Sequence, residues 1–435
     1  MKQEAKLFRS ELLGESYTKY VHASGLPIYV FPKKMTGTYA LFATNFGSVD
    51  NALDARGRKR LPDGIAHFLE HKLFTNEDGS DSFEHFSAYG ADANAYTSHT
   101  RTVYLFSCTD RFADSLRELL TFVTHPHFTP ESVAREQGII GEEIRMCLDN
   151  PYDRCYYNML AGLYRSHPVR VDVCGSVESI ATITDKTLYE AYRTFYQLSN
   201  MALVVCGDVS VESVIALADE CLPRVTPAPL PPRRTYCEKS AAHRRFVKAT
   251  GQVAKPIFSI GVKDTDIPSD PRERAKKDAG MAILSEMLFS ESGVLYNRLF
   301  DAGLISHEFS ADYALTRDFG FLQISGESDD PRAVLRAVQR EIAALQKSGL
   351  SRADFERCRR VEFAEYIKSF DSTEEIANTL LAFVFDDAQI FDWADIVRDM
   401  ELSYVEELLH RCFDPSYYTL SVVEPAERVQ EGETK

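Results

Sequence analysis

The alternation of apolar and polar residues along the first half of the chain predicts β-strands. Four segments are rich in Val, Tyr, Phe and Thr, which fit a pleated and partly buried surface. The four segments are Leu26–Pro32, Tyr39–Phe46, Arg101–Cys108 and Met201–Val209. Strands of this kind need a covering layer, so the pattern predicts a sheet packed against helices.

Helical spacing of apolar residues predicts the covering layer. The predicted helices are Gly64–Phe74, Arg111–His125 and Pro130–Leu148. The last of these has clear start signals, because Thr129 stands at the N-cap position and Pro130 in the first turn.

The chain also contains an internal repeat. Ala66–Phe74 (AHFLEHKLF) aligns with Met281–Phe289 (MAILSEMLF), and similar strand-like and helical segments follow both blocks in the same order. Between the halves lies a segment with five prolines in residues 223–232, which disfavour a helix or a central strand. We therefore predict an α+β fold of two homologous halves, each a mostly antiparallel sheet packed against helices. The predicted boundaries are residues 1–222, a Pro-rich linker at 223–235, and residues 236–435.

Composition and charge restrict the class of protein. The chain of 435 residues has 44% hydrophobic and 26% charged residues, as is typical of a globular protein. Its formal net charge of −16 disfavours nucleic acid as a partner. We find no apolar run long enough to span a membrane and no signal peptide, so we expect a cytoplasmic protein. The nine cysteines are scattered and never spaced C-x-x-C, which indicates thiols rather than disulfides or a cysteine zinc module.

The strongest chemical signal is the pentapeptide H-x-x-E-H at residues 67–71. On a helix, His67 and His71 lie one turn apart on one face, so both imidazoles can reach one tetrahedral metal. Glu70 projects from the same side and could take a proton from a metal-bound water. This spacing is a known signature of inverted zincins. The alternative is that both histidines are ordinary hydrogen-bonded or surface side chains.

A third ligand is expected from the acidic helix that begins at Pro130. Glu136 and Glu143 are seven residues apart, so they share a face but lie about 10 Å apart along the axis, and one zinc cannot easily bind both. One of them should be a ligand and the other an outer-shell residue, while Glu142 faces solvent. A purely solvated acidic helix face stays open as the alternative.

The combination of H-x-x-E-H with a later E-(x)6-E resembles the pitrilysin/insulinase family of zinc peptidases. GIAHFLEHKLF, NAYTSHTRTVY, HPVRVDVCGSVESI and FYQLSNMALVVCGDV follow in the family's order, and FSADYALTRDFGF continues it in the second half. The whole chain is most similar to the YmfH-like bacterial branch, whose architecture is close to that of mitochondrial processing peptidase subunits. The resemblance implies one zinc (Zn²⁺) per chain, with His67, His71 and Glu143 as ligands.

The resemblance also implies the roles of the residues around the metal. Glu70 would be the catalytic base, and Glu136 would support the site by orienting an imidazole or polarising a substrate group. In the family, the strand that contains Asn94 and Ala95 lies beside the metal and offers its edge to an extended peptide, which adds as a further strand. Asn94 is the candidate to hold the substrate backbone, although a plain edge or turn residue is an equal alternative.

The second half does not repeat the motif. The aligned residues are Ala282, Ser285 and Glu286, so this half has no metal-binding histidines there. Family members hold substrate with an Arg and a Tyr from a second half or a partner subunit, and the strand where we align that Arg has Leu322. The resemblance therefore implies a hetero- or homodimer with a related chain that lacks H-x-x-E-H.

Three functions remain open at this point. The first is a zinc endopeptidase that hydrolyses extended peptides or unfolded segments. The second is a non-catalytic structural subunit of a processing-peptidase-like assembly, and the third is a peptide-binding protein without turnover. The intact H-x-x-E-H and both helix glutamates favour the peptidase, because a scaffold has no physical need for them.

Overall fold

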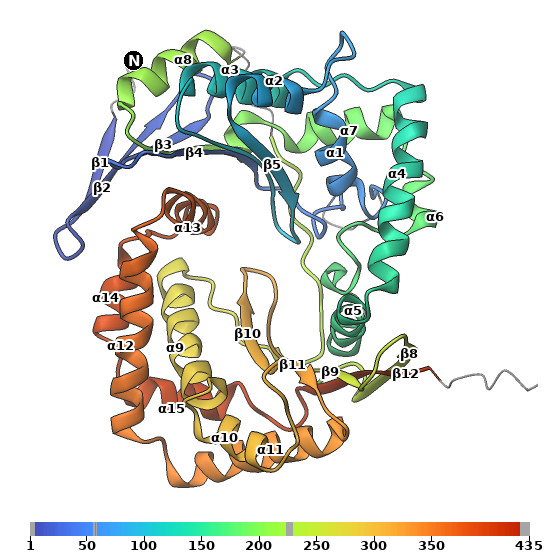
Figure 1. Cartoon of the computed structure of the whole chain (residues 1–435), viewed down its shortest axis with the longest axis vertical. Helices are drawn as coiled ribbons and strands as arrows, with labels where there is room; N and C mark the ends of the chain where they lie inside the picture. The colour runs from blue at the N-terminus through green and yellow to red at the C-terminus, as the bar shows by residue number, and fades with distance from the viewer. Residues whose placement is uncertain (1–4, 55–56, 58, 223–228, 427–435) are drawn as a thin grey trace, which may run out of the picture. The chain divides into compact units, whose positions relative to one another are not determined.

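The structure, a computed structural model, describes residues 5–54, 57, 59–222 and 229–426 (Figure 1). Of the predicted linker, residues 223–228 lie outside this description, and residues 229–235 belong to no helix or strand. The chain forms two compact units. Unit 1 comprises Met1–Ile144, Val171–Thr235 and Ala364–Asp395, and unit 2 comprises Arg145–Arg170, Tyr236–Phe363 and Ile396–Lys435. Both units are discontinuous in sequence, whereas the predicted boundaries at 222 and 236 divide the chain by its repeat and stay a prediction.

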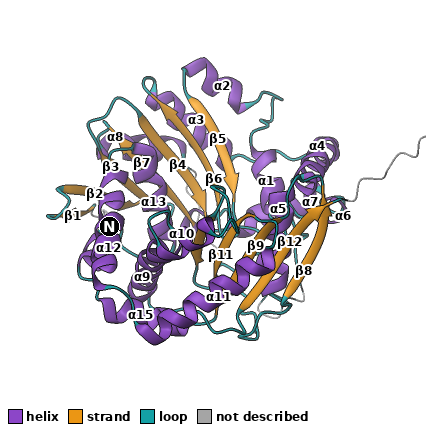
Figure 2. Ribbon diagram, turned by 60° about the horizontal axis from the view of Figure 1, so that its bottom comes forward, coloured by secondary structure: helices purple, strands orange, loops and turns teal. Residues whose placement is uncertain are grey.

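Unit 1 is built on a seven-stranded sheet (Figure 2). Its neighbouring strands pair antiparallel, except for the parallel pair β3 and β7. In spatial order the strands are β1 (Lys6–Ser10), β2 (Glu15–Val21), β3 (Pro27–Pro32), β7 (Met201–Gly207), β4 (Thr38–Thr44), β6 (Thr102–Cys108) and β5 (Asp92–Thr97). The four predicted strands are confirmed to within two residues at each end as β3, β4, β6 and β7. The sequence pattern does not predict β1 and β2.

Both faces of this sheet are buried, which explains why its central strands are almost wholly apolar. On β4, Ala40 and Phe42 belong to one core, and Tyr39 and Leu41 belong to the core on the opposite face. The first core is closed by helices whose apolar residues belong to it. These helices are α1 (Ile65–Leu73), α2 (Ser82–Tyr89), α3 (Phe112–Thr124), α4 (Pro130–Asp149), α6 (Val177–Ile180), α7 (Asp185–Phe195) and α8 (Val211–Cys221).

The second core of unit 1 is closed by a helix from the other half of the chain. α13 (Thr373–Phe385) contributes Ile376, Ala377, Leu380 and Leu381 to the cluster that contains Tyr39 and Leu41. α13 also contacts β4 and β7. The first half of the sequence therefore does not contain the whole core of its own sheet.

Unit 2 contains a five-stranded sheet that repeats the order of unit 1. In spatial order its strands are β10 (Ser310–Leu315), β11 (Gly320–Glu327), β9 (Ile257–Asp264), β12 (Tyr418–Pro425) and β8 (Phe246–Gly251), and only β12 and β8 are parallel. This order matches β5, β6, β4, β7 and β3 of unit 1 strand by strand. The predicted α+β fold of two homologous halves with mostly antiparallel sheets is confirmed.

Unit 2, in turn, contains a helix from the first half of the sequence. α5 (Pro151–Leu163), which comes from the first half of the sequence, packs on β8, β9 and β12. The aligned repeats fall on equivalent elements, since α9 corresponds to α1 and α12 corresponds to α4. The other helices of the described residues, in either unit, are α9 (Pro271–Phe289), α10 (Val294–Asp301), α11 (Pro331–Ser348), α12 (Arg352–Ser369), α14 (Asp392–Arg398) and α15 (Leu402–Arg411), together with the 3₁₀ turns Pro168–Arg170 in unit 2 and Leu198–Asn200 in unit 1.

Glu238 anchors the segment that follows α5 in unit 2. Its carboxylate accepts backbone N–H bonds from Arg165, Ser166 and His167 at 2.6–3.1 Å, and Lys263 Nζ lies 3.2 Å away. Burial alone would raise the pKa of Glu238, but these donors outweigh burial and lower the pKa to about 2. The group therefore stabilises the fold when it is ionised.

We expect Glu238→Gln to lower the free energy of unfolding at pH 7 by about 1–3 kcal/mol, since each pKa unit corresponds to about 1.4 kcal/mol. The folded pKa lies below the unfolded value, so this stabilisation is present above about pH 4.5 and is lost as the pH falls toward 2. Urea unfolding of both proteins between pH 7 and pH 3 measures the difference. Exposed Glu407 provides the control, and a difference that does not shrink toward pH 3 would contradict the interpretation.

Candidate metal centre

The two histidines of the H-x-x-E-H motif lie on α1, which is buried almost throughout. The helix begins after Gly64, whose φ of 88° is in the left-handed region that glycine adopts readily. His67 is only 7% exposed and Glu70 9%. The ring centroids of His67 and His71 are 4.6 Å apart, as expected for residues one turn apart on one face. Polar side chains buried in this way need partners.

Glu143 on α4 lies against both imidazoles. Its Oε1 is 3.5 Å from His67 Nε2, and its Oε2 is 3.5 Å from His71 Nε2. Nitrogen and oxygen ligands at tetrahedral positions around zinc lie about 3.4 Å apart. Each imidazole nitrogen is thus at ligand spacing from one oxygen of Glu143, and the donor types of the three side chains suit a zinc ion. The His67 imidazole is the main cause of a Glu143 pKa below its usual range.

Glu136 occupies a different position, behind His71. Its Oε1 is 3.1 Å from His71 Nδ1, and its Oε2 is 3.8 Å from Nζ of the fully buried Lys72. A proton on Nδ1 that is donated to Glu136 leaves the Nε2 lone pair facing Glu143. Burial alone would raise the pKa of Glu136. The hydrogen bond with His71 and the positive charges of Lys72 and Arg135 outweigh burial, so the pKa of Glu136 is lowered overall. Of the two glutamates, only Glu143 is therefore placed against both histidine Nε2 atoms.

The electric field at the centre favours a cation. Burial would lower the pKa of His71, yet the carboxylates of Glu136, Glu70 and Glu143 together raise it above its ordinary value. The same three carboxylates would stabilise a divalent ion at this place. A bound metal would displace the proton from His71, because a ligating imidazole must be neutral on its bound nitrogen.

Glu70 is oriented by the neighbouring strand. Its Oε2 accepts a hydrogen bond of 2.6 Å from Thr97 Oγ1 on β5, and α1 packs against β5 and β6. This bond leaves Oε1 of Glu70 available for other contacts. Thr97 is not predicted as a site residue from the sequence, although its place at the end of the strand that contains Asn94 and Ala95 is a signal that could have identified it.

Asn94 and Ala95 lie on β5, the last strand at one edge of the unit 1 sheet. β5 pairs with β6 on one side, where Asn94 stands opposite Leu105. The exposed Asn94 side chain accepts a 2.8 Å bond from the backbone N–H of Ala95. This edge strand is thus attached to the centre through Thr97 and Glu70.

One donor near the centre is not predicted from the sequence. Ligand atoms of His67, Glu143 and Cys174 all lie within 4.8 Å of one another, and Cys174 Sγ is 3.9 Å from His67 Nε2. Cys174 lies in HPVRVDVCGSVESI, 107 residues after His67, so only its presence in that segment could have drawn attention to it.

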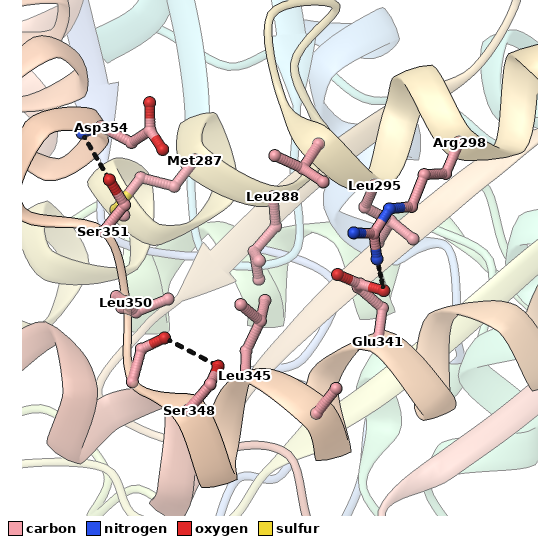
Figure 3. Close-up of a pocket in the computed structure, with 13 residues that line it drawn as sticks. Met287, Leu288, Leu295, Arg298, Glu341, Leu345, Ser348, Leu350, Ser351 and Asp354 are labelled. Carbon is pink, nitrogen blue, oxygen red and sulfur yellow. Dashed lines mark hydrogen bonds and ion pairs between the residues drawn. The ribbon is translucent and has the colours of Figure 1, made fainter.

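Unit 2 contains a separate cavity of about 520 Å³ between α9, α10, α11 and the start of α12 (Figure 3). Met287, Leu288, Leu295 and Leu345 contribute to its largely apolar lining, and Arg298 pairs with Glu341 at one side. The lining residues include neither histidine nor cysteine. This cavity is not part of the metal centre.

The second repeat carries no counterpart of the centre. On α9, the residues aligned with His67, Glu70 and His71 are Ala282, Ser285 and Glu286. Leu322 lies on β11 and is buried in the sheet of unit 2. The repeat thus preserves the fold of the first half without the H-x-x-E-H motif.

Comparison with known proteins places the chain in a family of peptidases. Residues 59–176 match the model of insulinase (peptidase family M16), and residues 182–362 match the model of the peptidase M16 inactive domain. The chain belongs to the M16 (pitrilysin/insulinase) family, as the motifs predict. The inactive-domain match begins at residue 182, within the first half, and extends to residue 362 of the half that lacks the motif histidines.

The relatives cover nearly the whole chain. The uncharacterized zinc protease YmfH of Bacillus subtilis is 36% identical over 423 residues, which are 95% of this chain and 98% of that protein. The zinc protease PqqE of Helicobacter pylori is 24% identical and covers 83% of both chains. A crystal structure of an M16-like peptidase from Alicyclobacillus acidocaldarius has a TM-score of 0.88 at 30% identity and covers 98% of this chain and 99% of its own.

These comparisons support zinc in general and a peptidase class. They leave the cytoplasmic location as a prediction, because one structural neighbour, PqqL of Escherichia coli, is described as a periplasmic protease. Among the described residues, no helix is both long and apolar enough to cross a membrane.

Proposed function

We propose that the chain is a zinc-dependent endopeptidase that hydrolyses extended peptides or unfolded segments of proteins. The observation that carries the proposal is the position of Glu143, 3.5 Å from Nε2 of His67 and of His71, with Glu70 on the same helix as both histidines. A scaffold protein would not need three ligand-type side chains at metal spacing beside an oriented carboxylate.

In this proposal His67, His71 and Glu143 hold one zinc ion per chain. When bound, zinc would act as a Lewis acid that lowers the pKa of a coordinated water to about 7. Glu136 would be a positioning residue, because its contact with His71 Nδ1 fixes the tautomer and orientation of that ring. Lys72, buried beside Glu136, would keep Glu136 ionised.

Glu70 would be the general base. Thr97 holds one of its oxygens, which fixes the rotamer and leaves the other oxygen to accept a proton from the attacking water. The same carboxylic acid could then deliver that proton to the departing amine nitrogen of the cleaved peptide bond. Proton transfer by a positioned carboxylate typically contributes a factor of about 10²–10⁴ in rate.

The substrate would bind as an extra strand on β5. Backbone bonds at a sheet edge accept any extended peptide, which would favour unfolded segments over folded ones. The Ala95 N–H is held by Asn94, so an incoming peptide could exchange with that side chain, with Asn94 turning to hold the substrate backbone. The Thr97 to Glu70 bond would align this strand with the catalytic group.

A partner chain would complete the substrate site. The second half has Leu322 buried in β11 at the place where we align the substrate-holding arginine. We therefore propose a dimer with a related chain that lacks H-x-x-E-H. The alternative function, a non-catalytic structural or peptide-binding subunit of such an assembly, would keep the fold and bind peptide without turnover.

The test is hydrolysis of unfolded proteins and quenched fluorogenic peptides by the zinc-loaded chain, alone and with the product of a neighbouring gene for a similar chain without H-x-x-E-H. The endopeptidase proposal expects cleavage that increases when the partner is added. Binding of peptides without cleavage in both conditions would favour the non-catalytic alternative.

A further inference from the structure

Cys174 lies closer to the proposed ligands than its sequence position suggests. Its Sγ is 3.9 Å from His67 Nε2 and belongs to the group of donors within 4.8 Å that includes Glu143. A thiolate and an imidazole bound to the same tetrahedral zinc lie about 3.6 Å apart. The observed separation is thus close to that of two ligands of one ion.

The backbone around Cys174 is fixed against the start of α1. A Cβ on Gly64 would lie 2.4 Å from the Cys174 carbonyl oxygen, and one on Gly175 would lie 2.6 Å from the carbonyl oxygen of Asp63. Both glycines have positive φ, 88° and 76°. Ser179 Oγ also donates to the Asp63 carbonyl at 2.8 Å. Close packing of this kind fixes the backbone of Cys174 and so limits the positions that its Sγ can take.

The burial and orientation of His67 also suit a metal on the Nε2 side of its ring. Its side chain is more than nine-tenths buried, and its Nε2 faces Glu143 and Cys174. Its Nδ1 has no hydrogen-bond partner among the described residues. A buried imidazole whose Nε2 points into a group of carboxylate and thiol donors is arranged as a metal ligand.

We infer that Cys174 Sγ is a fourth protein ligand, which binds the zinc as a thiolate when no substrate is present. The inference rests on the proposed metal centre of His67, His71 and Glu143 and adds a ligand to it. On binding, Sγ gives its proton to solvent and takes the position that a water would otherwise hold. Zinc with four protein ligands is closed, whereas catalytic zinc keeps one position open. The thiolate would therefore cap the resting site. Binding of a peptide would have to displace it, with Sγ taking back a proton from solvent and a water entering the position that Sγ leaves.

Cobalt(II) substitution tests this coordination directly. The full chain with one equivalent of Co²⁺ should show the intense near-ultraviolet charge-transfer absorption of a thiolate ligand. Cys174→Ser should lose that band and still bind one Co²⁺, whereas Cys221→Ser, at a thiol on α8, should keep it. A wild-type spectrum with bound cobalt and no such band, or a band that survives in Cys174→Ser, would overturn the inference.

A second measurement uses the unmodified protein. Zinc should slow iodoacetamide alkylation of Cys174 by about tenfold or more, because a coordinated thiolate is a poor nucleophile, while Cys221 should react at an unchanged rate. If Cys174 is alkylated at the same rate with and without bound zinc, Sγ does not coordinate the metal. Cys174 would then make only a hydrogen-bond contact with His67. Failure of the wild type to bind either metal would instead reject the metal centre itself, so the two failures can be distinguished.

Discussion

Glu70→Gln should bind zinc as the wild type does and should lose peptide hydrolysis by a factor of about 10²–10⁴. Glutamine has nearly the same shape and can still accept the hydrogen bond from Thr97 Oγ1, so the local structure should be preserved. It cannot accept the proton of the attacking water. The measurement is kcat on a fluorogenic peptide together with the zinc content of the same sample.

The matched control for this prediction is Glu142→Gln. Glu142 lies on α4 next to Glu143, but it is exposed, as the sequence predicts. This variant should keep the wild-type kcat. If Glu70→Gln cleaves at the wild-type rate in zinc-loaded form, Glu70 is not the base and the proposed mechanism is wrong.

The second large effect is expected from His67→Ala, which should weaken zinc binding by more than about 100-fold. Loss of an outer-shell partner already costs about 10–100-fold, and the loss of a ligand should cost more. Glu143→Gln should act in the same direction, because it removes the charged oxygens that face both imidazoles. Competition with a chelator of known affinity gives the dissociation constants.

His85→Ala controls for a general effect of losing a histidine. His85 lies on α2, where it pairs with Glu118 at 3.0 Å, away from the group of donors on α1 and α4. Its substitution should leave zinc affinity unchanged. An equal loss in His67→Ala and His85→Ala would place the metal elsewhere.

Much of unit 1 can be predicted from the sequence because the patterns that specify its helices and strands involve residues close together in the chain. The spacing of His67 and His71 on a helix depends only on the pitch of that helix, and the structure places them 4.6 Å apart between ring centroids. The start of α4 is equally local, since Thr129 Oγ1 accepts a 3.1 Å bond from the Ser132 N–H. The repeat predicts two sheets of one topology, because equal patterns favour equal elements.

Tertiary packing decides what the sequence pattern leaves open. Glu136 and Glu143 share a helix face, and only the packing of α4 on α1 determines which one lies between the two Nε2 atoms. Likewise, the fully buried β4 indicates a sheet covered on both faces, but no local pattern identifies α13, more than 300 residues away, as the cover. Cys174 is missed for the same reason, because its loop reaches α1 by close backbone packing at Gly64.

The exchange of helices makes each half of the sequence contribute to the core of the other unit. α5 belongs to the core of unit 2 and α13 to the core of unit 1, so neither half of the sequence encloses its sheet alone. A fragment of residues 1–222 would expose Tyr39, Leu41 and Val204, which α13 otherwise covers. The two halves of the chain are therefore interdependent, although only the first carries the H-x-x-E-H motif.

Metal content of the wild-type chain, purified without chelators and measured by plasma mass spectrometry, tests the central claim most directly. The account predicts about one zinc per chain, retained through dialysis and removed by a strong chelator. A wild-type protein that contains no zinc, and that takes up none when zinc is supplied, would contradict it.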